Sequence, residues 1–268
     1  MASKALIADI LRVMSITMWP ARILTVLSLL MPLAAQAAIG TAKPLPDSVH
    51  YRNCVAASSA NPAAALVDAE AWAKQGGGVP AQHCAALALF NLKRYAEAGT
   101  RLDRIAAEKS VPDASFRVSL FDQAGNAWLL AGNGDRAVQS FSAALTLSAG
   151  DADLFADLAR AQAMVRNWQE VVLDLNAALQ ISPHRVDLLV LRASARRALK
   201  RYDEARADIA VALKLRPGDA NALVESGLLR KQLGDVGGAK RDFEAALKHG
   251  AGEIAAQARE NLDALNAQ

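Results

Sequence analysis

The sequence predicts an all-α fold built from stacked helix pairs, and two observations support this prediction. First, one pattern recurs every 34 residues between Val118 and about Gly250 without an insertion. Its best-preserved copy, Val186–Asp219, reads as two helices joined by a tight turn at residues 200–203. Second, the composition is low in aromatic residues, at 5%, and rich in alanine, which suits closely packed helices. A fixed period of this length indicates a repeat protein whose neighbouring units complete one another's core.

The repeat register is defined by residue types that return at the same place in successive units. The returning sets are Tyr202 with Trp168 and Val236; Ala212 with Ala178, Ala144 and Ala246; Ile209 with Leu175, Phe141 and Phe243; Ala193 with Ala159, Gly125 and Gly227; and Pro217 with Pro183. Small residues allow paired helices to approach closely, and larger ones fill the space between them.

Charge gives little indication of a partner. The formal net charge is +3 over 268 residues, and residues 1–37 contribute three basic residues and one acidic residue to it. Without that segment the chain is close to neutral. Because no basic stripe with interleaved aromatic residues occurs, we do not expect a nucleic-acid partner.

The N-terminus has the pattern of a targeting segment. Arg22 precedes an apolar run over residues 23–33, which ends at the small-x-small pattern Ala35-Gln36-Ala37. We therefore expect a signal peptide over residues 1–37, cleavage after Ala37, and a periplasmic or secreted mature protein. The alternative is an uncleaved segment that anchors the protein in the inner membrane.

The first elements after this segment are expected to be irregular. Residues 38–47, with two prolines and a glycine, form a predicted lead-in. A degenerate helix pair is predicted over residues 48–78, with one helix over Ser48–Ser58. Asn61-Pro62 has the cap-then-proline pattern that opens a second helix, and the glycines of residues 76–78 end it.

Five repeat units are predicted over residues 79–252, followed by a capping helix over residues 253–268. The predicted units cover residues 79–112, 118–151, 152–185, 186–219 and 220–252. About five extra residues fall near Lys109, between the first and second units. In the last segment Ile254, Ala258, Leu262 and Leu265 share one helical stripe, which leaves a wet face opposite. A terminal repeat requires such a cap, because it would otherwise expose its stacking surface.

These units resemble tetratricopeptide repeats. The matching residues are Trp128 and Gly132; Trp168, Ala178 and Pro183; Tyr202, Asp203, Glu204, Ala205, Ala212 and Pro217; and Gly227, Gly234, Ala239, Phe243 and Ala246. Gly134, Val171 and Val236 depart from the family's pattern. The resemblance implies a right-handed α-solenoid with a concave face that binds a protein or an extended peptide.

Cys54 and Cys84 are the only cysteines in the chain. An even count in a chain expected to be exported favours a disulfide, each cysteine lying on the first helix of neighbouring pairs. Two free buried thiols are the first alternative. A metal site that uses His83 with Cys84 is the second, although no third and fourth ligands stand at a workable spacing.

The candidate binding surface follows from helical periodicity. On each first helix, repeat positions 2, 5, 9, 12 and 13 lie opposite the buried arc, and the resemblance implies that this side lines the concave groove. The predicted partner-binding residues are Leu87, Phe90, Asn91, Asp122, Asn126, Leu129, Leu130, Arg160, Met164, Val190, Ser194, Arg197, Leu228 and Lys231. The alternative for each is packing against the neighbouring first helix. Asp122 and Ala156 stand where some relatives place a lysine that grips a C-terminal carboxylate, so an Hsp90-type adaptor is disfavoured.

The sequence points to an interaction protein and not to an enzyme. No nucleophile, base and acid can be singled out together, and Gly132-Asn133-Gly134-Asp135 lacks the lysine and the preceding strand of a phosphate loop. We expect no cofactor and no metal. The predicted function is an exported scaffold or adaptor that binds a protein or peptide in its groove. The alternatives are a self-assembling structural spacer and an accessory factor to cell-envelope assembly enzymes.

Overall fold

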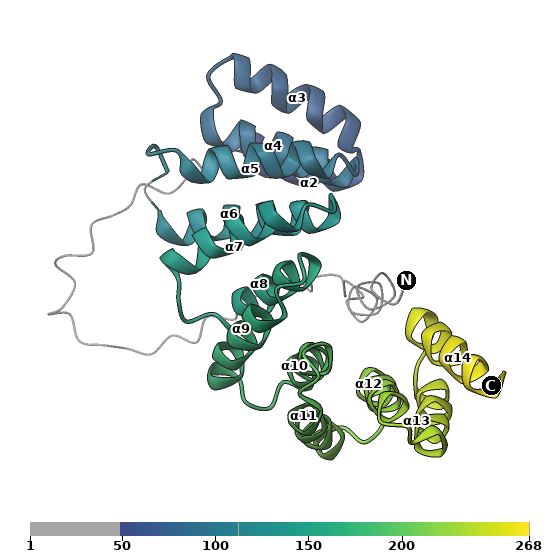
Figure 1. Ribbon diagram of the computed structural model, residues 1–268. Coiled ribbons are helices and arrows are strands. Elements are labelled where there is room, and N and C mark those ends of the chain that lie inside the picture. The colour runs from purple at the N-terminus through teal and green to yellow at the C-terminus, as the bar shows by residue number, and fades with distance from the viewer. Residues whose placement is uncertain (1–48, 112, 268) are drawn as a thin grey trace, which may run out of the picture.

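A computed structural model describes residues 49–111 and 113–267, and within them it contains thirteen helices and no strand (Figure 1). The helices are α2 (Val49–Ala60), α3 (Pro62–Lys74), α4 (Gly78–Asn91), α5 (Tyr95–Ala107), α6 (Ala114–Leu130), α7 (Gly134–Leu147), α8 (Ala152–Met164), α9 (Trp168–Ile181), α10 (Val186–Ala198), α11 (Tyr202–Leu215), α12 (Ala220–Gln232), α13 (Val236–His249) and α14 (Gly252–Asn266). The chain is an all-α solenoid of helix pairs. The expected signal peptide and lead-in lie outside the described residues.

The pairs stack along an arc. Figure 1 shows α8, α10, α12 and α14 along the inner side of this arc and α9, α11 and α13 along the outer side. Several first helices contact the first helix of the next unit directly, as α2 contacts α4, α6 contacts α8 and α10 contacts α12. We call the side of the array that the first helices form the inner surface.

The turn inside each unit uses the same backbone geometry. Lys93, Arg166 and Lys200 adopt positive φ angles of 61°, 64° and 62°, and Gly132 and Gly234 occupy the equivalent place with 74° and 82°. This left-handed conformation ends an α-helix by turning the chain back toward its own last carbonyls. Glycine adopts this conformation most easily, so the backbone is somewhat strained at Lys93, Arg166 and Lys200.

The core depends on matched residue sizes across each helix pair. Phe141 and Phe243 are fully buried and face Gly125 and Gly227. A Cβ atom on Gly125 would lie 2.6 Å from the Phe141 ring, and one on Gly227 would lie 2.5 Å from the Phe243 ring. In the two units between them, the corresponding pairs are Ala159 with Leu175 and Ala193 with Ile209. A smaller second-helix residue thus accompanies a larger first-helix residue.

The helix bounds differ from expectation at two places. The helix α4 begins at Gly78, although the sequence predicts that all three glycines lie between α3 and the next helix. The helix α6 begins at Ala114 and has 17 residues, against 13 in α8, α10 and α12. Asp113 caps α6, because its side chain accepts the Phe116 N–H at 3.0 Å. Because of this cap, α6 begins four residues before Val118, where the second unit is predicted to start.

Cys54 and Cys84 form a disulfide that joins α2 to α4, with their Cα atoms 6.0 Å apart. Both residues are buried, beside Ala69 and Ala85. The sequence prediction of this bridge is confirmed by the structure. A second link runs from Asn91, whose side-chain amide donates 2.9 Å to the Ser58 carbonyl near the end of α2. The first helix pair is therefore tied to the array at two points along α4.

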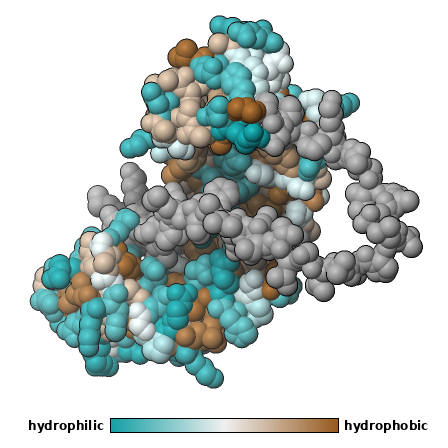
Figure 2. Space-filling view, turned by 180° about the vertical axis from the view of Figure 1, so that it is seen from behind, coloured by the Kyte–Doolittle hydropathy of each residue, from teal (hydrophilic) through white to brown (hydrophobic). Residues whose placement is uncertain are grey.

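Surface apolar residues are scattered. The large exposed ones are Val49, Val67, Leu173, Ile181, Val211, Leu215, Leu233 and Val236. On the side seen in Figure 2, apolar residues likewise form separate patches among polar ones. Within the two described ranges, no helix combines the length and the apolar character needed to cross a bilayer.

Candidate functional site

The predicted partner-binding residues differ in solvent exposure between the first three units and the last two. In the first three units they are at least partly exposed: Leu87, Phe90, Asn91, Asp122, Asn126, Leu129, Leu130, Arg160 and Met164. In the last two units Val190, Ser194, Arg197 and Leu228 are buried, and Lys231 is half-buried. The most accessible part of the predicted groove thus runs along α4, α6 and α8.

This accessible part carries both apolar and polar side chains. Leu129 and Phe90 each cover a buried cluster while keeping part of their surface exposed. Phe90 also packs edge-on against Tyr95, with ring centroids 5.3 Å apart. Met164 has a different environment, since a Cβ atom at Gly134 would lie 3.1 Å from its Cγ. Met164 therefore lies against the start of α7, at the edge of the inner surface.

Carboxylates gather between α6, α8 and the start of α10. Asn126 donates its amide to Asp122 Oδ1 and to the Asp122 carbonyl, both at 3.0 Å. One helix further, Arg160 forms an ion pair with Asp157. The sequence predicts Asp122, Asn126 and Arg160 as groove residues, and the structure gives each of them a polar neighbour on its own helix.

Arg185 connects this group of acids to the next unit. Its guanidinium lies 2.8 Å from Asp153 on α8 and 2.7 Å from Asp187 on α10. Three carboxylates beside the inner surface, those of Asp153, Asp157 and Asp187, are therefore paired with Arg160 or Arg185. The hydrogen-bond partner of Asp122 is instead the Asn126 amide.

Burial and this acidic neighbourhood change the protonation of Asp122. Burial, assisted by the charges of Asp157, Asp151 and Asp153, raises the pKa of Asp122 to about 7 against the effect of the Asn126 hydrogen bond. Burial also raises the pKa of Asp157, although Arg160 opposes the shift. A carboxyl that titrates near neutral pH thus lies among the predicted binding residues.

The stability of the protein is expected to fall as the pH rises through the Asp122 titration. The folded pKa of Asp122 lies above its ordinary value of 3.8, so the folded chain holds this proton more tightly than the unfolded chain. The resulting stabilisation is fully present below about pH 4 and is lost by pH 8, a change of up to about 4 kcal/mol. Thermal unfolding of the wild type and Asp122→Asn, measured from pH 4 to 8, tests this. The wild type should lose stability relative to the variant, and a constant difference would contradict the assignment.

A buried ion pair links the inner helices of the last two units. Arg197 Nε on α10 lies 2.5 Å from Glu225 Oε1 on α12, and the second guanidinium nitrogen lies 3.2 Å from Oε2. Both side chains are buried. The sequence predicts that Arg197 contacts a partner, and the structure corrects this, because the guanidinium is occupied within the array. Glu225 is absent from the prediction, since its place in the middle of a helix gives no sign that it faces Arg197 across two units.

A second polar network lies between the inner and outer helices. Asp208 on α11 receives two hydrogen bonds from Arg192, at 2.7 and 3.0 Å, and one from Arg196, at 2.6 Å. Arg192 also donates 2.7 Å to Asn176 on α9. The sequence does not identify this network, although aspartate recurs at the same repeat position as Asp174, Asp208 and Asp242.

His83 takes part in packing, and both of its ring nitrogens face protein side chains. The Tyr51 hydroxyl lies 2.6 Å from its Nδ1, and Gln123 Oε1 lies 2.9 Å from its Nε2. Burial lowers the pKa of His83, which favours the neutral ring that this arrangement accommodates. Because Cys84 is committed to the disulfide, the alternative of a site that uses both residues is wrong. No group of three or more potential metal ligands occurs in the described part of the chain.

Comparison with solved structures identifies the fold. A crystal structure of MamA matches with a TM-score of 0.51 and 19% identity, over 59% of this chain and 92% of that one. TTC0263, a thermophilic TPR protein from Thermus thermophilus, matches with a TM-score of 0.53 and 16% identity, over 68% of this chain and 96% of that one. YrrB, described as a TPR protein with an unusual peptide-binding site, matches with a TM-score of 0.53 and 17% identity, over 71% of this chain and 96% of that one.

Sequence comparison adds nothing to this result. No protein-family model matches the chain, and no curated protein matches it significantly. At such identities the structural likeness establishes the fold alone, and it confirms the resemblance that the repeat pattern predicts.

Proposed function

We propose that this chain, a solenoid with the tetratricopeptide-repeat fold, is an interaction scaffold that binds an extended segment of a partner protein along its inner surface. The observation that carries the proposal is the partly exposed surface of α4, α6 and α8, which presents both apolar and polar residues. YrrB, which shares the fold, is described as having a peptide-binding site, and this supports a peptide ligand here. The role requires no catalysis by the scaffold.

The apolar part of this surface supplies anchors. Leu87 and Phe90 lie on α4 and Leu129 lies on α6, and all three keep part of their surface in contact with water. Burying such side chains against a ligand contributes roughly 1.5–3 kcal/mol each at full burial. An extended segment reaches several units of a continuous array, so a few anchors of this size suffice for specific binding.

The polar part favours a ligand with basic groups. The carboxylates of Asp122, Asp153, Asp157 and Asp187 outnumber the guanidinium groups of Arg160 and Arg185 that pair with them. A lysine or arginine of the ligand placed near Asp122 would stabilise its charged form and lower its pKa. We infer that the preferred partner segment combines apolar residues with at least one cationic side chain.

We further propose that the protein functions outside the cytoplasm, in the periplasm or as a secreted protein. The N-terminal pattern over residues 1–37 is the main support. The disulfide between Cys54 and Cys84 is a second support, because such bridges persist in oxidising compartments. An inner-membrane anchor made by the same segment is the alternative. Edman sequencing of the protein isolated from cells distinguishes the two, since a chain that begins at Ala38 requires cleavage.

Charged substitutions on the inner surface are expected to abolish partner capture. The test variant is Leu87→Asp with Leu129→Asp, and the matched control is Leu173→Asp with Val211→Asp on the outer helices α9 and α11. Losing two apolar anchors should weaken binding at least about tenfold. Photo-crosslinking from position 91 in cell-envelope extracts identifies the partner, and pull-down with the two variants measures capture.

The control variant should capture the partner as well as the wild type, and both variants should keep the helical circular dichroism of the wild type. If the folded inner-surface variant still captured the partner at wild-type level, the inner surface would not be the binding site. If only the outer-surface control lost partner capture, the binding site would instead lie on α9 and α11.

A further inference from the structure

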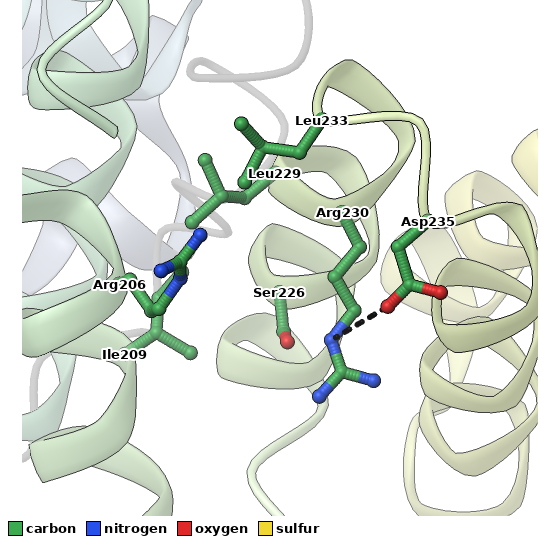
Figure 3. A pocket seen from close by; sticks show the side chains of 7 residues that line it. All are labelled: Arg206, Ile209, Ser226, Leu229, Arg230, Leu233 and Asp235. Atoms are coloured by element: carbon green, nitrogen blue, oxygen red, sulfur yellow. Dashed lines mark ion pairs between the residues drawn. The ribbon is translucent and has the colours of Figure 1, made fainter. Parts of the chain in front are cut away.

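A cavity of about 400 Å³ lies between α11 and α12, beside the turn into α13 (Figure 3). Its lining residues are Arg206 and Ile209 from α11; Ser226, Leu229 and Arg230 from α12; and Leu233 and Asp235 from the turn. Figure 3 shows Arg206 and Ile209 directed from one side toward Ser226 and Leu229, with the Arg230–Asp235 ion pair on the other side. The lining thus combines apolar side chains with charged ones.

The preceding unit explains why this space is open. Ser226 occupies the repeat position of Arg192, whose guanidinium bridges Asn176 on α9 and Asp208 on α11. One unit later Asn176 is replaced by Ala210 and Arg192 by Ser226. The unit that contains the cavity therefore lacks both the long cationic side chain and the amide that holds it.

The acceptor of that side chain is nevertheless retained. Asp242 occupies the repeat position of Asp208. The Ser226 hydroxyl donates 2.6 Å to Asp242 Oδ2, and Arg230 Nε lies 3.3 Å from the same oxygen. In the unit before, Arg196 occupies the position of Arg230 and shares Asp208 with Arg192. Among the described residues, Asp242 thus has one guanidinium partner where Asp208 has two.

We propose that this cavity binds an arginine side chain of a partner protein, whose guanidinium takes the place that Arg192 fills one unit earlier. Ile209, Leu229 and Leu233 offer an apolar wall for the methylene groups of the incoming side chain. Because Arg192 and Arg196 already share one carboxylate, the fold accommodates two guanidinium groups at this repeat position.

Both arginines that line the cavity are themselves paired with carboxylates. Arg206 and Arg230 are accompanied by three carboxylates, those of Asp203, Asp235 and Asp242. Arg206 is largely exposed, and its guanidinium lies 3.5 Å from Asp203. Of these five groups, Arg206, Arg230 and Asp235 line the cavity itself, and Asp203 and Asp242 pair with the two arginines without being part of the lining. The cavity is lined by α11, α12 and the turn after it, and the proposal does not depend on ligand binding along α4, α6 and α8.

The test uses N-acetyl-arginine N-methylamide as the probe, titrated into the full chain and followed by methyl and amide NMR. Saturable shifts are expected at Ile209, Leu229 and Ser226, with a dissociation constant on the order of millimolar for so small a ligand. The matched neutral probe, N-acetyl-citrulline N-methylamide, should bind at least about tenfold more weakly. Asp242→Asn should weaken the binding of the arginine probe at least about fivefold.

A filled cavity supplies the decisive variant. Ser226→Arg restores the residue that the preceding unit uses, so it should abolish probe binding without lowering the thermal midpoint of the protein. Ser226→Leu fills the same space without charge and should also abolish binding. Equal affinity for the citrulline probe, unchanged affinity in Asp242→Asn, or the lack of saturable shifts would overturn the proposal. The two probes and Asp242→Asn decide the question even if a filled variant fails to fold.

Discussion

Replacing Asp208 with alanine is expected to lower the free energy of unfolding by about 3–5 kcal/mol. Asp208 is 4% exposed and is the common acceptor of Arg192 and Arg196, both of which are mostly buried. Its removal leaves Arg192 without a carboxylate partner among the described residues and leaves Arg196 with Glu204 alone, at 3.4 Å, in a poorly solvated site. For a chain of this length the thermal midpoint should fall by roughly 6–20 °C, measurable by circular dichroism.

The equivalent residue of the preceding unit, Asp174, is the matched control, and its replacement should not destabilise the protein. Asp174 has no arginine at the corresponding positions, which are Leu158 and Gln162, and its Oδ2 is buried without a hydrogen-bond partner. Burial raises the pKa of Asp174 to about 7. Asp174→Ala should therefore leave stability unchanged or increase it at pH 8. Equal destabilisation by Asp174→Ala and Asp208→Ala would show that the position matters and the arginine pairing does not.

Removing the disulfide is expected to cost about 3–4 kcal/mol, located in the first helix pair. The bridge joins residues 30 apart in sequence, and chain entropy gives a value of this size for the closed loop. Cys54→Ala with Cys84→Ala keeps small apolar groups in the buried cluster. Because end units of a repeat array contact a single neighbour, α2 and α3 should detach before the rest unfolds.

Hydrogen exchange resolves this local effect. In the double variant, amides of α2 and α3 should exchange at least about a hundredfold faster, whereas amides of α10 to α13 should be unchanged. The reduced wild-type protein is the control and should match the variant. Unchanged protection of α2 would mean that Tyr51, His83 and Asn91 hold the pair without the bridge.

The fold could be predicted because its determinants recur along the chain. Residue size at the paired core positions, such as Gly125 with Phe141, repeats in register, and so does the turn position occupied by Gly132 and Lys200. The two cysteines were few enough to allow a single pairing. Each of these signals depends on local spacing, which a sequence displays directly.

The polar networks could not be predicted in the same way. Arg192 lies on the buried arc of a repeat, where an apolar residue is expected, and only the structure shows that it reaches Asn176 and Asp208. The pairing of Arg197 with Glu225 depends on the distance between helices of neighbouring units. The start of α6 depends on the cap that Asp113 provides. Long side chains and caps are selected by three-dimensional neighbours, which periodicity does not specify.

The matching of Gly125 with Phe141 and of Gly227 with Phe243 limits how this array can be rearranged. An exchange of α6 for α8 would bring Ala159 against the Phe141 ring, where even a methyl group lacks room, while the reverse exchange would leave a void beside Leu175. Duplication or recombination within such a gene is therefore tolerated when breakpoints fall between helix pairs and is penalised when they fall inside one. The helix pair is therefore the unit of this protein that can be duplicated or exchanged, whereas a single helix cannot be exchanged without disturbing the core.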